Sequence, residues 1–200
     1  MRICVLSDCL ESHDAIVALG QQGHEVYWCL PTAHMSTLLA EAVQLSTVTD
    51  MLPATCQHVV PLQAYDYQGV RLLVLAQALW HQPDFHTRLF TLLCLLHRAL
   101  PCQIWHAWCS MPLAYLTVYT ARFVTVPAVV SCDAAMLAAR GQQPFLWDWM
   151  MRHASVVVVP SQEAYEQLAG CQAGVRVSVL EAGSPLLGQR LAALYKGLQV

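Results

Sequence analysis

The sequence predicts an α/β domain in which a single doubly wound, mostly parallel sheet carries helices on both faces. The run Ala154–Val159 (ASVVVV) is continuously apolar and rich in β-branched residues, which is typical of a strand buried on both faces of a parallel sheet. Pro160 ends this run, a helical pattern follows, and Val175–Leu180 forms a second apolar run. This stretch therefore predicts a β-α-β unit at the centre of the domain.

Composition agrees with one well-buried domain and with the absence of a transmembrane segment. The 200 residues are 56% hydrophobic and only 12% charged, with a mean hydropathy of +0.44. The longest uncharged run, Ala99–Ala121, is interrupted by Pro101, His106 and Pro112, which a membrane-spanning helix would not tolerate well. We therefore expect this run to lie in a buried α/β core.

Charge argues against a nucleic-acid partner. The formal net charge is −3, and no basic patch with interleaved aromatic residues occurs in the sequence. Lys196 is the single lysine, so Schiff-base chemistry and a phosphate-loop lysine have almost no candidates.

The cysteine and histidine patterns predict neither a disulfide framework nor a metal or cofactor site. The nine cysteines are scattered without a C-x-x-C pair, and Arg2–Ser7 already reads as a folded strand rather than a secretory signal. Reduced thiols in the cytoplasm are the expectation. His81 and His86 flank Pro83 near Asp84 at a spacing that could bind a metal, but no third ligand of fixed spacing follows.

In the N-terminal half, the strand Arg2–Ser7 leads into a helix that Gly23 closes. Leucine-rich segments at Val70–Trp80 and Phe85–Leu100 recur at helical spacing, and they predict a pair of packing helices rather than a lipid-binding stripe. The other elements expected here are a helix at His13–Gln22, a strand at Glu25–Leu30, a helix at His34–Gln44, a strand at Val59–Leu62 and a loop at Ala64–Gly69.

In the C-terminal half, a strand ends in WHAW, and Ser110 with Pro112 forms a suitable N-cap and first turn for the next helix. Ser161 is placed to cap a later helix, with Glu163 in its first turn. The elements expected here are strands at Gln103–Trp108, Val126–Cys132, Ala154–Val159 and Val175–Leu180, and helices that end near Phe123, near Arg152, before Gly170–Gly174 and near Tyr195.

The segments HASVVVVPSQEAYEQL and VRVSVLEAGSPL resemble the end of the N-terminal domain of a family-4 glycosyltransferase with the GT-B architecture of two Rossmann-like domains. MRICVLSD and GHEVYWC resemble the first two strands of the same domain. The resemblance implies that residues 1–183 are the acceptor-side Rossmann-like domain. Residues 184–200 would then form a C-terminal helix or tail at the start of a linker to a donor-binding domain, which is missing from this chain.

The first turn departs from this family. In the family that turn is usually rich in glycine, whereas here it carries Ser7, Asp8, Glu11 and Ser12, and two carboxylates would repel a diphosphate unless a cation lay between them. The Arg/Lys pair and the Glu-rich motif of the donor-binding half have no counterpart in the chain. We therefore expect activity only with a separate or deleted donor-binding domain.

The candidate site residues lie at or just after the carboxyl ends of predicted strands, and the carboxyl ends of parallel strands meet at one edge of the sheet. For catalysis the candidates are Asp133 and His106, either of which could deprotonate an acceptor hydroxyl in an inverting transfer. For substrate binding they are Asp8, Glu11, Ser12, Trp108, Cys132 and Ser161. Structural roles stay open for three of them: Ser161 and Asp133 can be helix caps, and His106 can be a satisfied core histidine.

The function implied is the acceptor-binding half of a hexosyltransferase-type enzyme that uses a nucleotide-sugar donor. The expected partners are that donor, a sugar or lipid-linked acceptor, and a protein that supplies the donor domain, at a cytoplasmic site or one peripheral to a membrane. The alternative is a non-catalytic binding or scaffold module derived from a glycosyltransferase. A split enzyme requires an exposed apolar face at the carboxyl edge, whereas a free-standing module should cover that face with its terminal helix.

Overall fold

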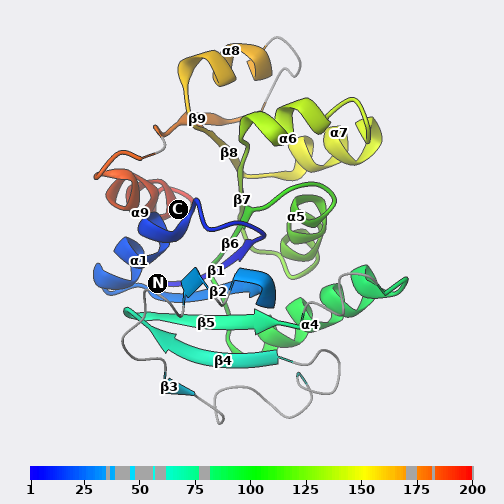
Figure 1. The fold of residues 1–200 in the computed structure, drawn as a ribbon. Helices are drawn as coiled ribbons and strands as arrows, with labels where there is room; N and C mark the ends of the chain where they lie inside the picture. The colour runs from blue at the N-terminus through cyan, green and yellow to red at the C-terminus, as the bar shows by residue number, and fades with distance from the viewer. Residues whose placement is uncertain are drawn as a thin grey trace.

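The computed structural model describes residues 1–34, 37–38, 46–47, 56, 62–76, 82–169, 175–181 and 183–199. Within these residues nine strands form one sheet in the order β3-β4-β5-β2-β1-β6-β7-β8-β9 (Figure 1). The strands are β1 (Arg2–Ser7), β2 (Glu25–Pro31), β3 (Ser46–Thr47), β4 (Leu62–Tyr67), β5 (Val70–Leu75), β6 (Ile104–Trp108), β7 (Ala128–Ser131), β8 (Val156–Val159) and β9 (Val177–Val179). The seven strands from β5 to β9 in this order are parallel, which confirms the predicted sheet.

Strand β1 lies where the chain changes direction across the sheet. It pairs with β2 on one side, with Leu6 opposite Cys29, and with β6 on the other, with Leu6 opposite Ala107. The chain runs outward from β1 to β2 and later returns to build β6 to β9 on the opposite side. In open α/β sheets, a crevice forms at the carboxyl edge near such a switch point.

Helices cover both faces of the sheet, as the sequence predicts. One face is covered by α4 (Phe85–Ala99), α5 (Leu113–Phe123), α6 (Ala134–Ala139), α7 (Pro144–His153) and α8 (Gln162–Ala169), and the opposite face by α1 (His13–Gln21) and α9 (Leu187–Lys196). Alternate strand residues feed the two layers, so that Cys4 and Leu6 face α4 and α5 while Ile3 and Val5 face α1 and α9. Because both faces are covered, the central strands are mostly apolar and buried. None of the helices in the described residues is both long enough and apolar enough to cross a bilayer.

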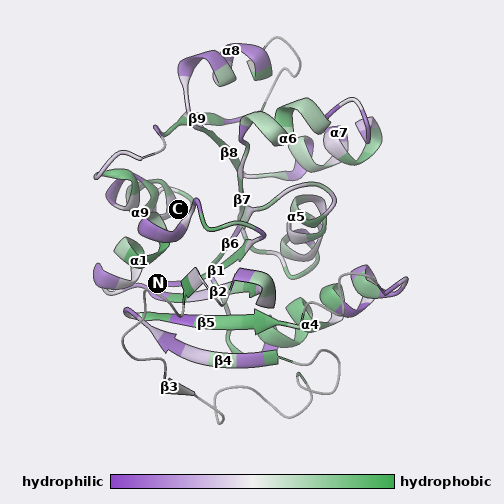
Figure 2. Cartoon of the chain, viewed as in Figure 1, coloured by the Kyte–Doolittle hydropathy of each residue, from purple (hydrophilic) through white to green (hydrophobic). Residues whose placement is uncertain are grey.

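The hairpin of β4 and β5 corrects two expectations. The loop expected at Ala64–Gly69 is strand β4 followed by a two-residue turn, and the helix expected from Val70 begins instead as strand β5, antiparallel to β4. Gln68 and Gly69 have φ angles of 46° and 85°, the left-handed pair that a tight hairpin turn requires. Figure 2 shows β5 as largely hydrophobic beside a more mixed β4. This agrees with a position for β5 inside the sheet.

Other expectations fall partly on residues that the structure does not describe. Of the helix expected at His34–Gln44, residues 34, 37 and 38 are described, and His34 ends a short 3₁₀ helix, Thr32–His34. Residues 59–61 of the expected strand and residues 77–80 of the expected helix also lie outside the described part. The short strand β3 was not predicted, and it pairs antiparallel with β4.

The terminal helix α9 packs against α1 and belongs to the core of its face. A Cβ placed on Gly188 would lie 2.6 Å from the Cβ of Ala18, so only glycine allows the two helices to approach this closely. The buried residues of α9 are Leu187, Gly188, Leu191, Ala192 and Tyr195. The helix therefore covers a face of the sheet beside α1, and the domain boundary at Gly183 stays a prediction.

Candidate functional site

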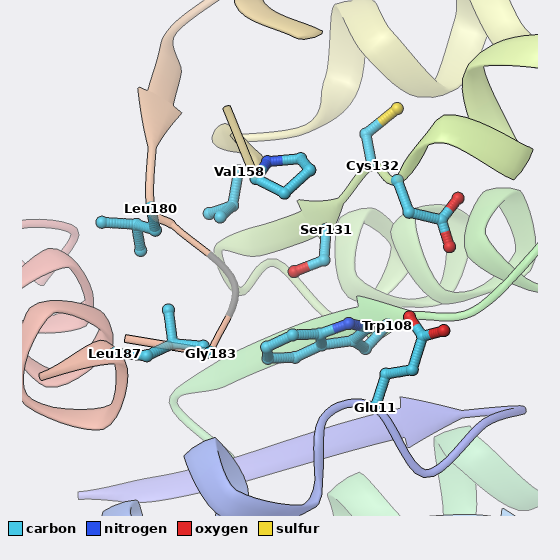
Figure 3. Close-up of a pocket in the computed structure, with 10 residues that line it drawn as sticks. Glu11, Trp108, Ser131, Cys132, Val158, Leu180, Gly183 and Leu187 are labelled. Carbon is cyan, nitrogen blue, oxygen red and sulfur yellow. The ribbon is translucent and has the colours of Figure 1, made fainter. Parts of the chain in front are cut away.

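A cavity of about 240 Å³ lies at the carboxyl ends of β6, β7 and β8, where α9 and the first turn approach the sheet edge (Figure 3). Its lining residues are Glu11, Trp108, Ser131, Cys132, Asp133, Val158, Pro160, Leu180, Gly183 and Leu187. Four of the eight predicted site residues line this cavity: Glu11, Trp108, Cys132 and Asp133. The strand ends thus bring these four together, as the parallel topology predicts.

Trp108 and Glu11 form one wall of the cavity. Figure 3 shows the side chain of Glu11 beside the indole ring of Trp108, with Ser131 above the ring. Trp108 is the last residue of β6 and half-buried, whereas Glu11 is exposed in the turn between β1 and α1. A flat apolar surface therefore lies next to a carboxylate.

Asp133 and Cys132 follow directly after β7. The Oδ1 atom of Asp133 accepts a hydrogen bond of 2.7 Å from the backbone N–H of Met136, so the predicted capping role is present in helix α6. This bond fixes the carboxylate at the cavity. Burial and the nearby Asp133 raise the pKa of the Cys132 thiol to about 12. Cys132 is therefore protonated at neutral pH and is not a nucleophile in this state.

His106 lies behind the cavity wall and is fully buried. Its ring stacks on that of Trp108, with a centroid distance of 5.1 Å and an interplanar angle of 29°. Its Nε2 atom lies 2.8 Å from Ser131 Oγ, and its Nδ1 atom lies 2.5 Å from the hydroxyl oxygen of Tyr195 on α9. One imidazole thus holds two of the residues that line the cavity, Trp108 and Ser131.

The direction of these hydrogen bonds follows from the burial of Tyr195. Burial raises the pKa of Tyr195 well above its ordinary value, so the phenol keeps its proton. Among the described residues the hydrogen-bond partner of this hydroxyl is His106 Nδ1, and a buried donor needs an acceptor. We therefore assign the proton of His106 to Nε2, which donates to Ser131 Oγ. The hydroxyl proton of Ser131 is then available to a ligand in the cavity.

The imidazole of His106 is neutral at ordinary pH. Desolvation disfavours its charged form and lowers its pKa to about 3. A neutral ring with its proton on Nε2 presents no basic nitrogen to the cavity. His106 is thus a buried core histidine with a hydrogen-bond partner at each ring nitrogen, as the structural alternative expected.

The remaining predicted residues lie elsewhere. The Oδ2 atom of Asp8 accepts hydrogen bonds from the backbone N–H of Ser110, at 2.8 Å, and from the Ser110 hydroxyl. Asp8 lines a second, wider cavity of about 660 Å³ with His34, on the other side of the first turn. Ser12 is buried with its Oγ 3.3 Å from Ser7 Oγ, and Ser161 Oγ accepts a bond of 3.1 Å from Ala164 N at the start of α8. The capping role considered for Ser161 is therefore confirmed.

Among the residues that sequence reasoning missed are Ser131 and Leu187, which line the cavity, and Tyr195, which supports the cavity wall through His106. The predicted strand ended at Cys132, whereas β7 ends at Ser131. The selection of residues at strand ends would have included Ser131 if the strand had been predicted one residue shorter. Leu187 and Tyr195 come from α9; a terminal helix at the carboxyl edge was expected only for a free-standing module, and none of its residues was named as a site residue.

No metal centre is visible in the part of the chain that the structure describes. Within these residues no group of three or more histidine, cysteine, aspartate or glutamate side chains is placed to hold an ion. Cys4 and Cys29 have sulfur atoms 3.9 Å apart in the core, and both are free thiols.

Comparison with known proteins shows the fold and no closer relationship. No protein-family model matches the chain, and no curated protein matches its sequence. A sucrose-phosphate synthase structure from Thermosynechococcus elongatus matches with a TM-score of 0.67 and 10% identity, and the match covers 100% of both chains. The UDP-GlcNAc 2-epimerase from Methanocaldococcus jannaschii matches with a TM-score of 0.59 and 8% identity, over 90% of this chain and 45% of that one. An Arabidopsis thaliana UGT complexed with UDP matches with a TM-score of 0.58 and 12% identity, over 98% of this chain and 57% of that one.

At these identities the similarity concerns the fold alone. It supports the GT-B fold that the resemblance implied. This chain spans about half the length of the epimerase and of the UGT. Membership of family 4 and the position as an N-terminal half stay predictions.

Proposed function

We propose that this chain is the acceptor-binding half of a glycosyltransferase, with the acceptor sugar bound in the cavity between Trp108 and Asp133. A second Rossmann-like domain, supplied by another chain or another part of the protein, would bind the nucleotide-sugar donor. The observation that carries the proposal is the composition of the cavity, where an aromatic face, two carboxylates and one directed hydroxyl converge on one small space.

These groups suit a carbohydrate. The indole of Trp108 offers an apolar face for the C–H side of a sugar ring, and the carboxylates of Glu11 and Asp133 accept hydrogen bonds from hydroxyl groups. Ser131 donates one hydrogen bond because His106 already occupies one of its acceptor positions. The volume of about 240 Å³ is slightly below the roughly 300–1,000 Å³ of pockets for drug-sized ligands, which favours a group of the size of one sugar ring.

The chemistry assigned to the chain is proton removal from the acceptor. In an inverting transfer, Asp133 would take the proton of the acceptor hydroxyl. The oxygen of that hydroxyl would form a bond to C1 of the donor sugar as the bond from C1 to the nucleoside diphosphate breaks. Asp133 suits this role better than Glu11 because its hydrogen bond to Met136 N holds it at the end of β7, whereas Glu11 is exposed. Glu11 would instead bind a sugar hydroxyl.

His106 takes a positioning role in this proposal. The general-base role considered for it requires a nitrogen lone pair that faces the substrate, and both of its nitrogens are engaged with Ser131 and Tyr195. Its contribution is to hold the Trp108 ring and the Ser131 hydroxyl in place.

The need for a donor half is supported by the acidic first turn. Asp8 and Glu11 stand where a glycine-rich turn would otherwise approach phosphate groups, and neither carboxylate forms an ion pair with a residue that the structure describes. Stabilisation of a diphosphate leaving group would therefore come from the partner. An additional protein partner is part of this proposal.

Binding of a sugar to the purified chain is the first test. Tryptophan fluorescence should change on titration with glucose, mannose or N-acetylglucosamine, and the change should disappear in Trp108→Phe. Trp149→Phe is the matched control, because it removes an indole from α7, outside the cavity lining. UDP alone should produce no change.

The second test separates an enzyme half from a binding module. A partner recovered by co-purification should transfer sugar from UDP-glucose to the acceptor only in the presence of this chain. Sugar binding without a partner or any transfer would favour the non-catalytic module. Absence of sugar binding at the cavity, measured also by NMR shift changes of residues that line it, would refute the proposal.

A further inference from the structure

The wider cavity, of about 660 Å³, lies on the other side of the first turn from the cavity that Trp108 and Asp133 line. Residues that follow β1, β2 and β6 form it together with the start of α4, and its polar lining includes Asp8, His34 and Ser110. Among the described lining residues, none is common to the two cavities. The wider cavity is therefore a separate candidate site.

Asp8 and Ser110 present only hydrogen-bond acceptors to a ligand. Ser110 donates its backbone N–H, at 2.8 Å, and its hydroxyl proton to Oδ2 of Asp8. The Ser110 hydroxyl thus keeps its lone pairs but has no proton left to donate. Within the described part of the chain, Oδ1 of Asp8 has no hydrogen-bond partner. These two bonds hold the half-buried carboxylate in place with one oxygen unused.

His34 adds a third acceptor. Its Nε2 atom lies 2.7 Å from the backbone carbonyl oxygen of Asp8. A carbonyl oxygen can only accept, so we assign the proton to Nε2, and Nδ1 of the neutral ring then carries a lone pair. Among the residues that the structure describes, this Nδ1 atom has no hydrogen-bond partner.

We propose that the wider cavity binds a small organic ligand through a primary ammonium group. An ammonium group has three N–H donors and no acceptor, whereas a sugar hydroxyl both donates and accepts. The three fixed groups offer acceptors only, and one of them is a carboxylate, so they match an ammonium group in hydrogen bonding and in charge. The first cavity differs from this one because Ser131 has a proton to donate there.

Other charged ligands fit the wider cavity less well. A phosphate or a carboxylate would meet the charge of Asp8, and the described lining contains neither a lysine nor an arginine. A metal ion requires more protein ligands, and within the described residues no three histidine, cysteine, aspartate or glutamate side chains are placed to hold one.

The remaining lining suits the carbon skeleton of such an amine. Pro31, Phe85 and Leu113 contribute apolar surface to the cavity. The volume of about 660 Å³ falls within the roughly 300–1,000 Å³ of pockets for small organic ligands. This inference does not depend on the proposed sugar-binding role of the first cavity, because the two cavities rest on different residues.

An NMR titration of the ¹⁵N-labelled full chain tests the inference with three probes of equal chain length: hexylamine, 1-hexanol and hexanoate. At pH 8 an alkylamine still carries its proton. We expect hexylamine to produce saturable shifts at Asp8, His34 and Ser110, including the signal of His34 Nδ1. 1-Hexanol should bind at least about tenfold more weakly, since hydrogen bonds between charged groups contribute more than neutral ones, and hexanoate should not bind.

Two matched variants locate the ammonium group. Asp8→Asn keeps an oxygen that can accept from Ser110 but turns an NH₂ group toward the cavity, so hexylamine should bind at least about tenfold more weakly. Asp14→Asn removes an exposed carboxylate at the start of α1, outside the described lining of the wider cavity, and should change the affinity by less than about twofold. Thermal melting shows whether each variant has kept its fold.

Three results would overturn the inference. One is the absence of saturable shifts at Asp8, His34 and Ser110 with hexylamine, and another is an equal affinity for 1-hexanol; both are measured on the wild-type chain and need no variant. The third is an equal loss of affinity in Asp8→Asn and Asp14→Asn, which would mean that the acidic first turn attracts amines without a defined site. Failure of sugars to bind beside Trp108 would refute the proposed function and leave this inference unaffected.

Discussion

The buried imidazole of His106 predicts a specific dependence of stability on pH. Its pKa is lowered from 6.5 in the unfolded chain to about 3 in the folded protein, because burial disfavours the charged ring. A group with a lowered folded pKa stabilises the protein above its unfolded pKa, and this contribution is lost as the pH falls toward the folded pKa. The unfolded chain binds the proton first, so acid favours unfolding.

The size of the effect follows from these two pKa values. Between the two pKa values, the loss approaches about 1.4 kcal/mol for each pH unit. Integration from pH 7 to pH 4 gives a loss of about 3 kcal/mol from this one group. That is a large fraction of the roughly 5–15 kcal/mol by which ordinary domains are stable.

The assay is urea unfolding at pH 7, 6, 5 and 4, followed by far-UV circular dichroism, for the wild type and for His106→Asn. The variant loses hydrogen bonds and is less stable at pH 7, but it has no titrating ring at this position. We expect the difference in unfolding free energy between the two proteins to shrink by about 3 kcal/mol from pH 7 to pH 4. His86→Asn makes the same substitution at an exposed position of α4 and controls for the exchange itself.

Parallel stability curves would refute the reasoning. They would mean that the ring of His106 binds its proton equally well in the folded and unfolded states, which a fully buried imidazole held by Tyr195 and Ser131 should not do.

Three further substitutions test the neighbouring structure. Tyr195→Phe leaves the buried Nδ1 of His106 without its hydrogen-bond partner and should lower the unfolding free energy by about 1–3 kcal/mol in the same urea assay. The control Tyr165→Phe, at an exposed position of α8, should change it by less than about 0.5 kcal/mol. Asp133→Asn keeps a good N-cap but removes the base, so turnover by the assembled pair should fall about a hundredfold or more at nearly unchanged thermal stability; unaltered turnover would exclude the assigned role. Gly20→Ala would place a Cβ 2.7 Å from a backbone oxygen in the turn between β4 and β5 and should cost about 1–3 kcal/mol, whereas Gly141→Ala meets nothing within 4 Å and should be tolerated; equal melting temperatures would contradict this packing.

The central strands could be predicted because burial on both faces leaves a clear pattern. Val156–Val159 and Ile104–Trp108 are short apolar runs between helix signals, and the structure confirms strands at both. The β4–β5 hairpin could not be predicted from periodicity alone. The leucines of VRLLVL fit the spacing of a helix as well as the continuous burial of a strand, and the Gln68–Gly69 turn was the signal that distinguishes them.

The candidate site was predictable to the extent that parallel strands determine it. Trp108 ends a strand and Cys132 and Asp133 follow one, and the topology alone brings strand ends to one edge. The contact between His106 and Tyr195 joins residues 89 positions apart and depends on how α9 is rotated against the sheet. No local sequence pattern determines this rotation, because any helix with one apolar side could pack against the same apolar face of the sheet.

Helix α9 connects the fold to the cavity in a way that a terminal tail would not. Leu187, at its start, lines the cavity, and Tyr195, near its end, reaches His106 beneath the cavity wall. The close approach of Gly188 to α1 fixes the helix between these two contacts. Because His106 in turn supports Trp108 and Ser131, a displacement of α9 would change a lining residue directly and two others through one buried ring. The shape of the proposed sugar site is therefore determined by the last helix as much as by the strands that carry its polar groups.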